Sequence, residues 1–309
     1  MTSHLMKRPL PDVLRRGLES AVANWPLIAL RIAENVVFFI MIVVSIIAAV
    51  VPVLVSIGIA AFDVDNPAES ATAIGTSLIE HLSVFLWIFL GALFVAFLMM
   101  VIHSFVMAGC AQTLVDADRS RGTLKVFNME RWVSGGKRST WTVFWIYNIT
   151  YGTTLIPVLV PLVLTLAGLL AFHDRMMPVA VIGCFGIAAA LFLFVIACVI
   201  ASIWSLKAMV IAAEHNLGAS EAAKLAWAEA KADFGRHFAV AFILLVISVG
   251  GAATIGTFSM FFTITPAHNA YMSLAFAPAR MVASVFQGAF TAAVGMWMLA
   301  SFAALSDRP

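Results

Sequence analysis

The residues best suited to chemistry in this sequence are four soft side chains on one helical face. Met99, His103, Met107 and Cys110 fall within about 80° of one another at the ~100° per residue of an α-helix. Thioether, thiol and imidazole groups are the ligands that Cu(I) selects. In a membrane helix, however, methionine fills packing gaps, cysteine acts as a small hydrophobe and histidine bonds a neighbouring helix. With 15 methionines in the chain, we favour packing and predict no metal or cofactor.

A second polar stretch lies further along the chain and is followed by two prolines. Tyr147, Asn148 and Tyr151 precede Pro157 and Pro161 inside a long apolar run. Each proline removes a backbone donor and should kink a helix. Because broken polar helices expose binding sites in transporters, this stretch predicts a ligand path at Tyr147, Asn148 and Tyr151. Alternatively, its hydroxyls satisfy the carbonyls that the prolines leave free, and they pack against neighbouring helices.

Two charged residues stand near the start of the first apolar run. Arg31 and Glu34 are three positions apart, so they can pair on a helix. Charges inside a membrane are costly and are often functional. Trp25 marks the interface only one or two turns earlier, and Arg31 can extend its guanidinium to the headgroups. We therefore expect a lipid contact or a structural pair here rather than a transport site.

Motifs of the common enzyme classes are not found. There is no Ser-His-Asp order, no H-E-x-x-H and no phosphate-binding glycine loop. The three cysteines lack the spacing of a zinc site. A net charge of +2 is too small to indicate a nucleic-acid partner. These observations disfavour catalysis.

The elements that position these residues are long apolar runs. Hydrophobic residues make up 62% of the chain and charged residues only 11%, whereas soluble domains are near half apolar and about a quarter charged. A span needs about 20 apolar residues. Six runs qualify: Leu27–Ala61, Leu82–Leu114, Trp141–Phe172, Val179–Ala213, Phe238–Phe262 and Leu274–Leu305. The sequence predicts an all-α polytopic membrane protein, and the first run is too long for a signal peptide.

The basic residues predict the orientation. If the N-terminus is cytoplasmic, only Arg175 and Arg280 of the 18 Lys and Arg residues lie on the outer side. The positive-inside rule then places both termini in the cytoplasm. Asp63, Asp65 and Glu69 make the first outer loop acidic. The pattern is typical of a bacterial inner membrane protein.

Each pair of spans is preceded by a segment with the pattern of a surface helix. In the first, Asp12 is a candidate N-cap, and one face carries Leu14, Leu18, Ala21, Val22 and Trp25 while the other carries Arg15, Arg16, Glu19 and Asn24. Ser220–Phe234, with Trp227, and Thr123–Arg138, with Trp132, occupy the matching places. The predicted lipid-interface residues are Arg15, Arg16, Trp25, Arg31, Trp132 and Trp227.

An acidic residue four positions before a glycine also repeats. Asp118 precedes Gly122, and Glu214 precedes Gly218. A glycine at this point can adopt φ > 0 and end the projecting helix. We therefore predict one membrane domain, residues 1–309, built from repeat units of about 10–114, 115–213 and 214–305.

The stretch Lys207–Trp227, together with Ala117–Gly122, resembles bacterial membrane domains built from repeated hairpins. The family is the membrane domain of glycerophosphodiester phosphodiesterases and its stand-alone relatives of unknown function. The resemblance implies an all-α membrane module. No phosphodiesterase domain is found in these residues, so the resemblance implies no activity.

We expect a non-enzymatic inner-membrane protein that binds lipids, partner proteins or both, as a scaffold, assembly factor or accessory subunit. Three basic, aromatic-bearing surface helices support this expectation. Small residues at Ser284, Gly288 and Ala292 would allow close helix packing within the chain or in a homo-oligomer. The alternative is a small-molecule or lipid transporter that uses the kinked third span.

Overall fold

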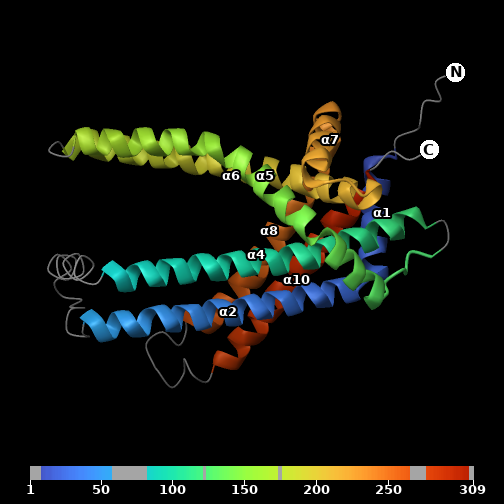
Figure 1. Cartoon of the computed structure of the whole chain (residues 1–309), viewed down its shortest axis with the longest axis horizontal. Helices are drawn as coiled ribbons and strands as arrows, with labels where there is room; N and C mark the ends of the chain where they lie inside the picture. Colours follow the sequence, from blue (N-terminus) through green and yellow to red (C-terminus); the bar gives the residue numbers. More distant parts are fainter. Residues whose placement is uncertain (1–7, 58–81, 121–122, 173–175, 265–275, 306–309) are drawn as a thin grey trace. The chain divides into compact units, whose positions relative to one another are not determined.

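The computed structural model describes residues 8–57, 82–120, 123–172, 176–264 and 276–305. All regular elements in these ranges are α-helices, which confirms the all-α prediction (Figure 1). They are α1 (Leu10–Ala23), α2 (Pro26–Ile57), α4 (Leu82–Arg119), α5 (Met129–Ala171), α6 (Met176–His215), α7 (Ala219–Ala232), α8 (Phe234–Ile264) and α10 (Ala277–Ala304). The predicted acidic loop around Asp65 lies outside the described residues.

Six of these helices are long and apolar enough to cross a membrane: α2, α4, α5, α6, α8 and α10. Many large apolar side chains are exposed on these helices, for example Phe39, Phe94 and Phe192. Exposure of so much apolar surface is unfavourable in water. The chain is therefore a multi-pass integral membrane protein. The predicted spans match these helices closely except at the start of α5.

Helix α5 begins at Met129 and not at Trp141. The side chain of Asn128 accepts hydrogen bonds from the backbone N of Glu130 at 2.9 Å and of Arg131 at 3.2 Å, which caps the helix here. The polar turns that were expected to form a separate surface helix are thus the first turns of the span. Only α1 and α7 are separate short helices before a span in the described chain.

The chain divides into two compact units. The smaller unit comprises residues 32–103 and contains most of α2 and the first part of α4. The larger unit comprises residues 1–31 and 104–309. The division into three repeats stays a prediction.

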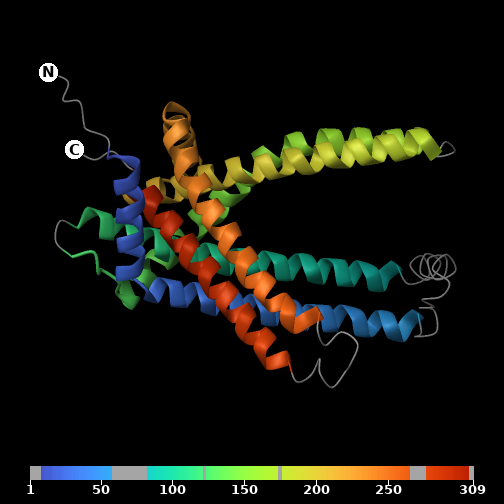
Figure 2. The ribbon, with the colours of Figure 1, turned by 180° about the vertical axis from the view of Figure 1, so that it is seen from behind.

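In the larger unit, consecutive spans pair as hairpins. Helices α5 and α6 lie side by side over the part near the end of α5 and the start of α6, and α8 and α10 also pack on each other (Figures 1 and 2). Helix α1 packs on α10, and α7 packs on α6. The core lies where α4, α6 and α10 end, and its fully buried side chains include Leu114, Met209, Leu299 and Phe302. This core sets the geometry of the polar contacts described below.

Two glycines allow these helices to approach closely. A Cβ on Gly109 would lie 2.6 Å from Nε1 of Trp132 and 2.8 Å from its carbonyl oxygen. A Cβ on Gly17 would lie 2.8 Å from the backbone N of Ser301. Trp132 is only 6% exposed and meets Phe105 edge-on, with ring centroids 5.3 Å apart. The expectation that Trp132 lies at the lipid interface is therefore corrected, because a glycine on α4 provides space for it inside the protein.

Two local predictions about helix ends are also corrected. Helix α1 begins at Leu10 with Pro9 as its N-cap. Asp12 lies in the first turn, where its negative charge interacts favourably with the helix dipole. After α6 the left-handed residue is Asn216, with φ 54°, whereas Gly218 has φ −68° and is the N-cap of α7. Asparagine tolerates this conformation better than most residues. Gly122 lies outside the described residues.

Candidate functional site

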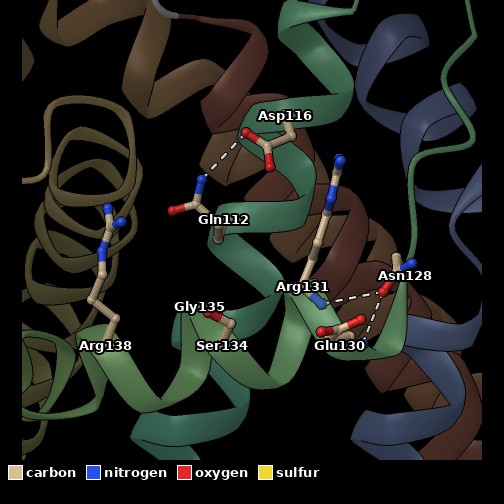
Figure 3. A pocket seen from close by; sticks show the side chains of 8 residues that line it. All are labelled: Gln112, Asp116, Asn128, Glu130, Arg131, Ser134, Gly135 and Arg138. Atoms are coloured by element: carbon tan, nitrogen blue, oxygen red, sulfur yellow. Dashed lines mark hydrogen bonds between the residues drawn. The ribbon is translucent and has the colours of Figure 1, made fainter.

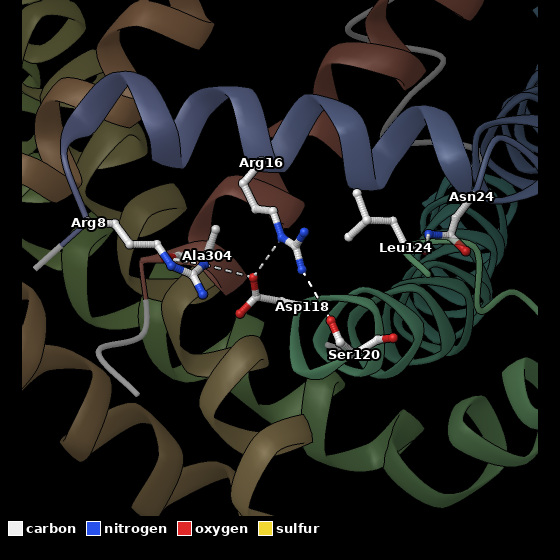
Figure 4. Close-up of polar contacts among 7 residues, drawn as sticks. All are labelled: Arg8, Arg16, Asn24, Asp118, Ser120, Leu124 and Ala304. Carbon is white, nitrogen blue, oxygen red and sulfur yellow. Dashed lines mark hydrogen bonds and ion pairs between the residues drawn. The ribbon is translucent and has the colours of Figure 1, made fainter. Parts of the chain in front are cut away.

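A buried carboxylate joins α1, α4 and α10 at one end of the larger unit. The side chain of Asp118 is 3% exposed, and its Oδ1 lies 2.9 Å from Nη1 of Arg8 and 3.6 Å from Nε of Arg16 (Figure 4). Arg8 also donates to the carbonyl oxygen of Ala304 at 3.4 Å, and Arg16 donates to that of Ser120 at 3.4 Å. Because these contacts use charge inside the fold, Arg16 has a structural partner in addition to its expected interfacial role.

Asn24 holds the junction of α1 and α2 to the segment before α5. Its Nδ2 donates to the carbonyl oxygens of Ser20 at 2.9 Å and Leu124 at 2.7 Å. Its Oδ1 accepts from the backbone N of Val126 at 3.0 Å and of Phe127 at 2.9 Å. The prediction that Asn24 lies on the polar face of α1 is wrong. Asn24 is buried, and its side chain satisfies backbone groups of the segment before α5. Nothing in the sequence near Asn24 predicts that this segment lies beside it.

The second acid of the repeated pattern also meets an arginine. Nη2 of Arg119 donates to the carbonyl oxygen of Glu214 at 2.6 Å and lies 3.7 Å from its Oε1. The ends of α4 and α6 are thereby tied together. Sequence reasoning identified both acids, Asp118 and Glu214, but not their contacts, because the partners come from distant parts of the chain.

Helix α1 has three distinct sides. Val13, Gly17, Ser20 and Ala21 are buried against the protein. Leu18 and Val22 are exposed on the second side, and Trp25, just after the helix, is 63% exposed. Arg15 and Glu19 are exposed and paired on the third side, with Nε and Oε1 3.4 Å apart. A helix with one protein-facing, one apolar and one polar side is suited to a position between protein, lipid and water.

A polar cavity of about 600 Å³ lies between the end of α4 and the start of α5 (Figure 3). It is lined by Gln112, Asp116, Asn128, Glu130, Arg131, Ser134, Gly135 and Arg138. Nε2 of Gln112 donates to Oδ1 of Asp116 at 3.2 Å. Within the described ranges, the side chains of Glu130, Arg131 and Arg138 have no hydrogen-bond or ion-pair partner. The cavity thus offers two cations and two carboxylates to a ligand.

The cavity continues into an aromatic stripe on α5. At about 100° per residue, Arg131, Ser134, Arg138, Trp141 and Trp145 fall within about 80° of one another. Trp141 is 58% exposed and Trp145 is 55% exposed. Exposed tryptophans next to arginines are typical of the headgroup level of a membrane.

The predicted soft-metal face is occupied by ordinary contacts. In the smaller unit, Nδ1 of His103 lies 2.7 Å from Oε1 of Glu34, and Met99 is partly buried. In the larger unit, Met107 and Cys110 are buried in the core. No group of three or more His, Cys, Asp or Glu residues that could hold a metal occurs in the described part of the chain.

The polar residues of the third span bond mainly within the protein. Nδ2 of Asn148 donates to the carbonyl oxygen of Phe144 at 2.8 Å, and the hydroxyls of Tyr151 and Ser202 lie 3.0 Å apart. Tyr147 lies beside Tyr151, with ring centroids 6.1 Å apart. The helix is continuous through Pro157. The ligand path stays a prediction.

The remaining predicted interface residues lie on two helices of the larger unit. Trp227 on α7 is half exposed and packs on Trp204, with ring centroids 5.0 Å apart. Arg31 on α2 is partly exposed. Their contact with lipid stays a prediction.

No protein-family model matches this chain, and no curated protein or solved structure is significantly similar to it.

Proposed function

We propose that this integral membrane protein is a non-enzymatic module that binds membrane lipids at a cytoplasmic end, as a scaffold, assembly or accessory subunit of a bacterial inner membrane. The observation that carries the proposal is the three-sided surface of α1. The exposed Val22 on α1 and Trp25 just after the helix can enter the acyl boundary while Arg15 stays with the headgroups. Each basic residue near an anionic leaflet contributes roughly 1 kcal/mol to binding.

The distribution of arginines supports the proposed orientation. Nη2 of Arg236 at the start of α8 donates to the carbonyl oxygen of Arg8 at 2.7 Å, and Arg8 in turn reaches Asp118. Arg119 lies next along α4. The basic residues from distant parts of the chain therefore share one end of the larger unit, as the positive-inside rule requires of a cytoplasmic end.

The buried charges support a structural rather than a catalytic assignment. Asp118 is matched by two arginines, and Lys207 is matched by Glu229 at 2.8 Å. A buried charge whose partner lies within the fold needs no substrate to balance it, and removal of that partner is costly. The hydroxyls of Thr150 and Thr154 in the third span donate to carbonyls of their own helix and so already have partners. We therefore favour lipid binding over transport through this span.

Native mass spectrometry of the protein extracted from its own membrane in a mild detergent tests this proposal. We expect retained phospholipid, a co-extracted protein subunit, or both. A bare protein would contradict the proposal. One stoichiometric soluble ligand would instead favour the transporter alternative and direct attention to Tyr147, Asn148 and Tyr151.

A further inference from the structure

We infer that the cavity between α4 and α5 binds the phosphoethanolamine headgroup of a membrane phospholipid. The inference rests on the proposed function and specifies its ligand. A cavity of about 600 Å³ is in the size range of small-molecule sites, roughly 300–1,000 Å³, and can hold a lipid headgroup. The lining residues, the solvent-facing charges and the adjoining stripe of α5 each support this assignment.

The charges of the cavity match a headgroup that carries both signs. Arg131 and Arg138 can each bind phosphate oxygens through their planar guanidinium groups. Asp116 and Glu130 can accept hydrogen bonds from an ammonium group. A headgroup with negative charge alone would be placed beside two carboxylates, which is unfavourable.

The residues that line the cavity indicate which type of headgroup amine it can bind. A quaternary ammonium is recognised by aromatic faces, whereas none of the eight described lining residues is aromatic. A primary ammonium donates three hydrogen bonds. Carboxylate oxygens of Asp116 and Glu130 and the amide oxygen of Gln112 are suitable acceptors. These residues therefore favour ethanolamine over choline.

The stripe on α5 provides a place for the acyl chains. Beyond Arg138 it continues through the exposed rings of Trp141 and Trp145 to Gly152, where a Cβ would have no neighbour within 4 Å. Ile156, one turn further, is exposed. A lipid whose phosphate meets Arg138 would place its chains along this apolar surface.

Native mass spectrometry of the full-length protein in detergent, with phosphatidylethanolamine, phosphatidylglycerol and phosphatidylcholine of identical chains, tests the inference. We expect phosphatidylethanolamine to bind about tenfold more tightly than the other two. Arg138→Gln and Arg131→Gln should each lower its affinity by about tenfold, the scale of one charge-assisted hydrogen bond. Lys224→Gln, which removes an exposed charge on α7, is the matched control and should have no effect.

The carboxylates give an independent readout. Glu130→Gln, alone or with Asp116→Asn, should reduce the preference for phosphatidylethanolamine over phosphatidylglycerol while the circular dichroism spectrum is unchanged. Equal binding of the three lipids, or a preference that survives both arginine substitutions, would overturn the inference and leave the proposed function standing. Displacement of the lipid by an equal concentration of free phosphoethanolamine would overturn the assignment to a lipid. If the unmodified protein retains neither lipid nor a partner protein, the proposed function itself would be contradicted.

Discussion

Nζ of Lys207 lies 2.8 Å from Oε2 of Glu229, and this ion pair joins α6 to α7. The lysine side chain is 2% exposed and the glutamate 43%. A buried ammonium contributes to stability only while its charge is matched. The pair is reinforced nearby, since Nε1 of Trp204 on α6 donates to the carbonyl oxygen of Ala223 on α7 at 2.7 Å.

Glu229→Gln should therefore destabilise the protein by about 3 kcal/mol, because it leaves the Lys207 ammonium buried without this carboxylate. Lys207→Met in the same chain should recover most of the loss, since it removes the charge. Thermal unfolding in detergent, followed by circular dichroism, measures both. Glu221→Gln on the same helix is the control, with a change within about 0.5 kcal/mol. A double variant no more stable than Glu229→Gln alone would contradict the account.

Asn24→Ala should cost about 2–4 kcal/mol, because four hydrogen bonds are lost at a buried position. Asn24→Asp should cost at least as much, because it places a buried carboxylate oxygen against the carbonyl oxygens of Ser20 and Leu124 that the amide now donates to. Asn148→Ala is the matched control, since the exposed Asn148 bonds only to its own helix among the contacts described. Equal melting temperatures for Asn24→Ala and Asn148→Ala would show that the contact with the loop does not stabilise the fold.

Gly109→Ala should destabilise the contact of α4 with α5 by about 1–3 kcal/mol, because the new methyl group would clash with Trp132. Gly152→Ala on α5 has open space and should be neutral or stabilising by up to about 1 kcal/mol. Melting temperatures of the two variants, each compared with the unmodified protein, test this contrast. Equal melting temperatures for the two variants would refute the close approach of α4 and α5 at Gly109.

The six spans could be predicted from the sequence, because a membrane demands long apolar runs and these are visible locally. Helix α2, for example, begins at Pro26, one residue before the predicted start of the span at Leu27. The start of α5 was missed, since capping by Asn128 joins polar turns to an apolar span. Hydrophobicity alone does not report this continuity.

The candidate site was predicted less well. Arg16 and Asp118 were each singled out, yet their contact depends on how α1 meets the end of α4 in the fold, and no spacing in the sequence predicts that arrangement. The cavity on α4 and α5 was missed altogether. A signal was present in the stripe from Arg131 through Arg138 to Trp141 and Trp145, which has helical spacing. The interpretation of Thr123–Arg138 as a separate surface helix obscured it.

A cysteine introduced at Lys125 should react with a membrane-impermeant maleimide only after the cells are permeabilised, because the exposed Lys125 belongs to the proposed cytoplasmic end. A cysteine at Asp65 should react in intact cells. The native Cys184 and Cys198 are replaced by alanine to remove background. The opposite labelling pattern at both positions would reverse the orientation and remove the basis for binding an inner leaflet.

The most direct test of the account is photo-cross-linking with a phosphatidylethanolamine that carries a diazirine near the glycerol end of one chain. The protein is reconstituted in a bilayer, irradiated and mapped by peptide mass spectrometry. We expect label concentrated between Trp141 and Gly152 of α5, and reduced there by Arg138→Gln but not by Lys224→Gln. Label spread evenly over the spans, or concentrated in the apolar groove of α8 and α10 at Phe258 and Phe286, would contradict it.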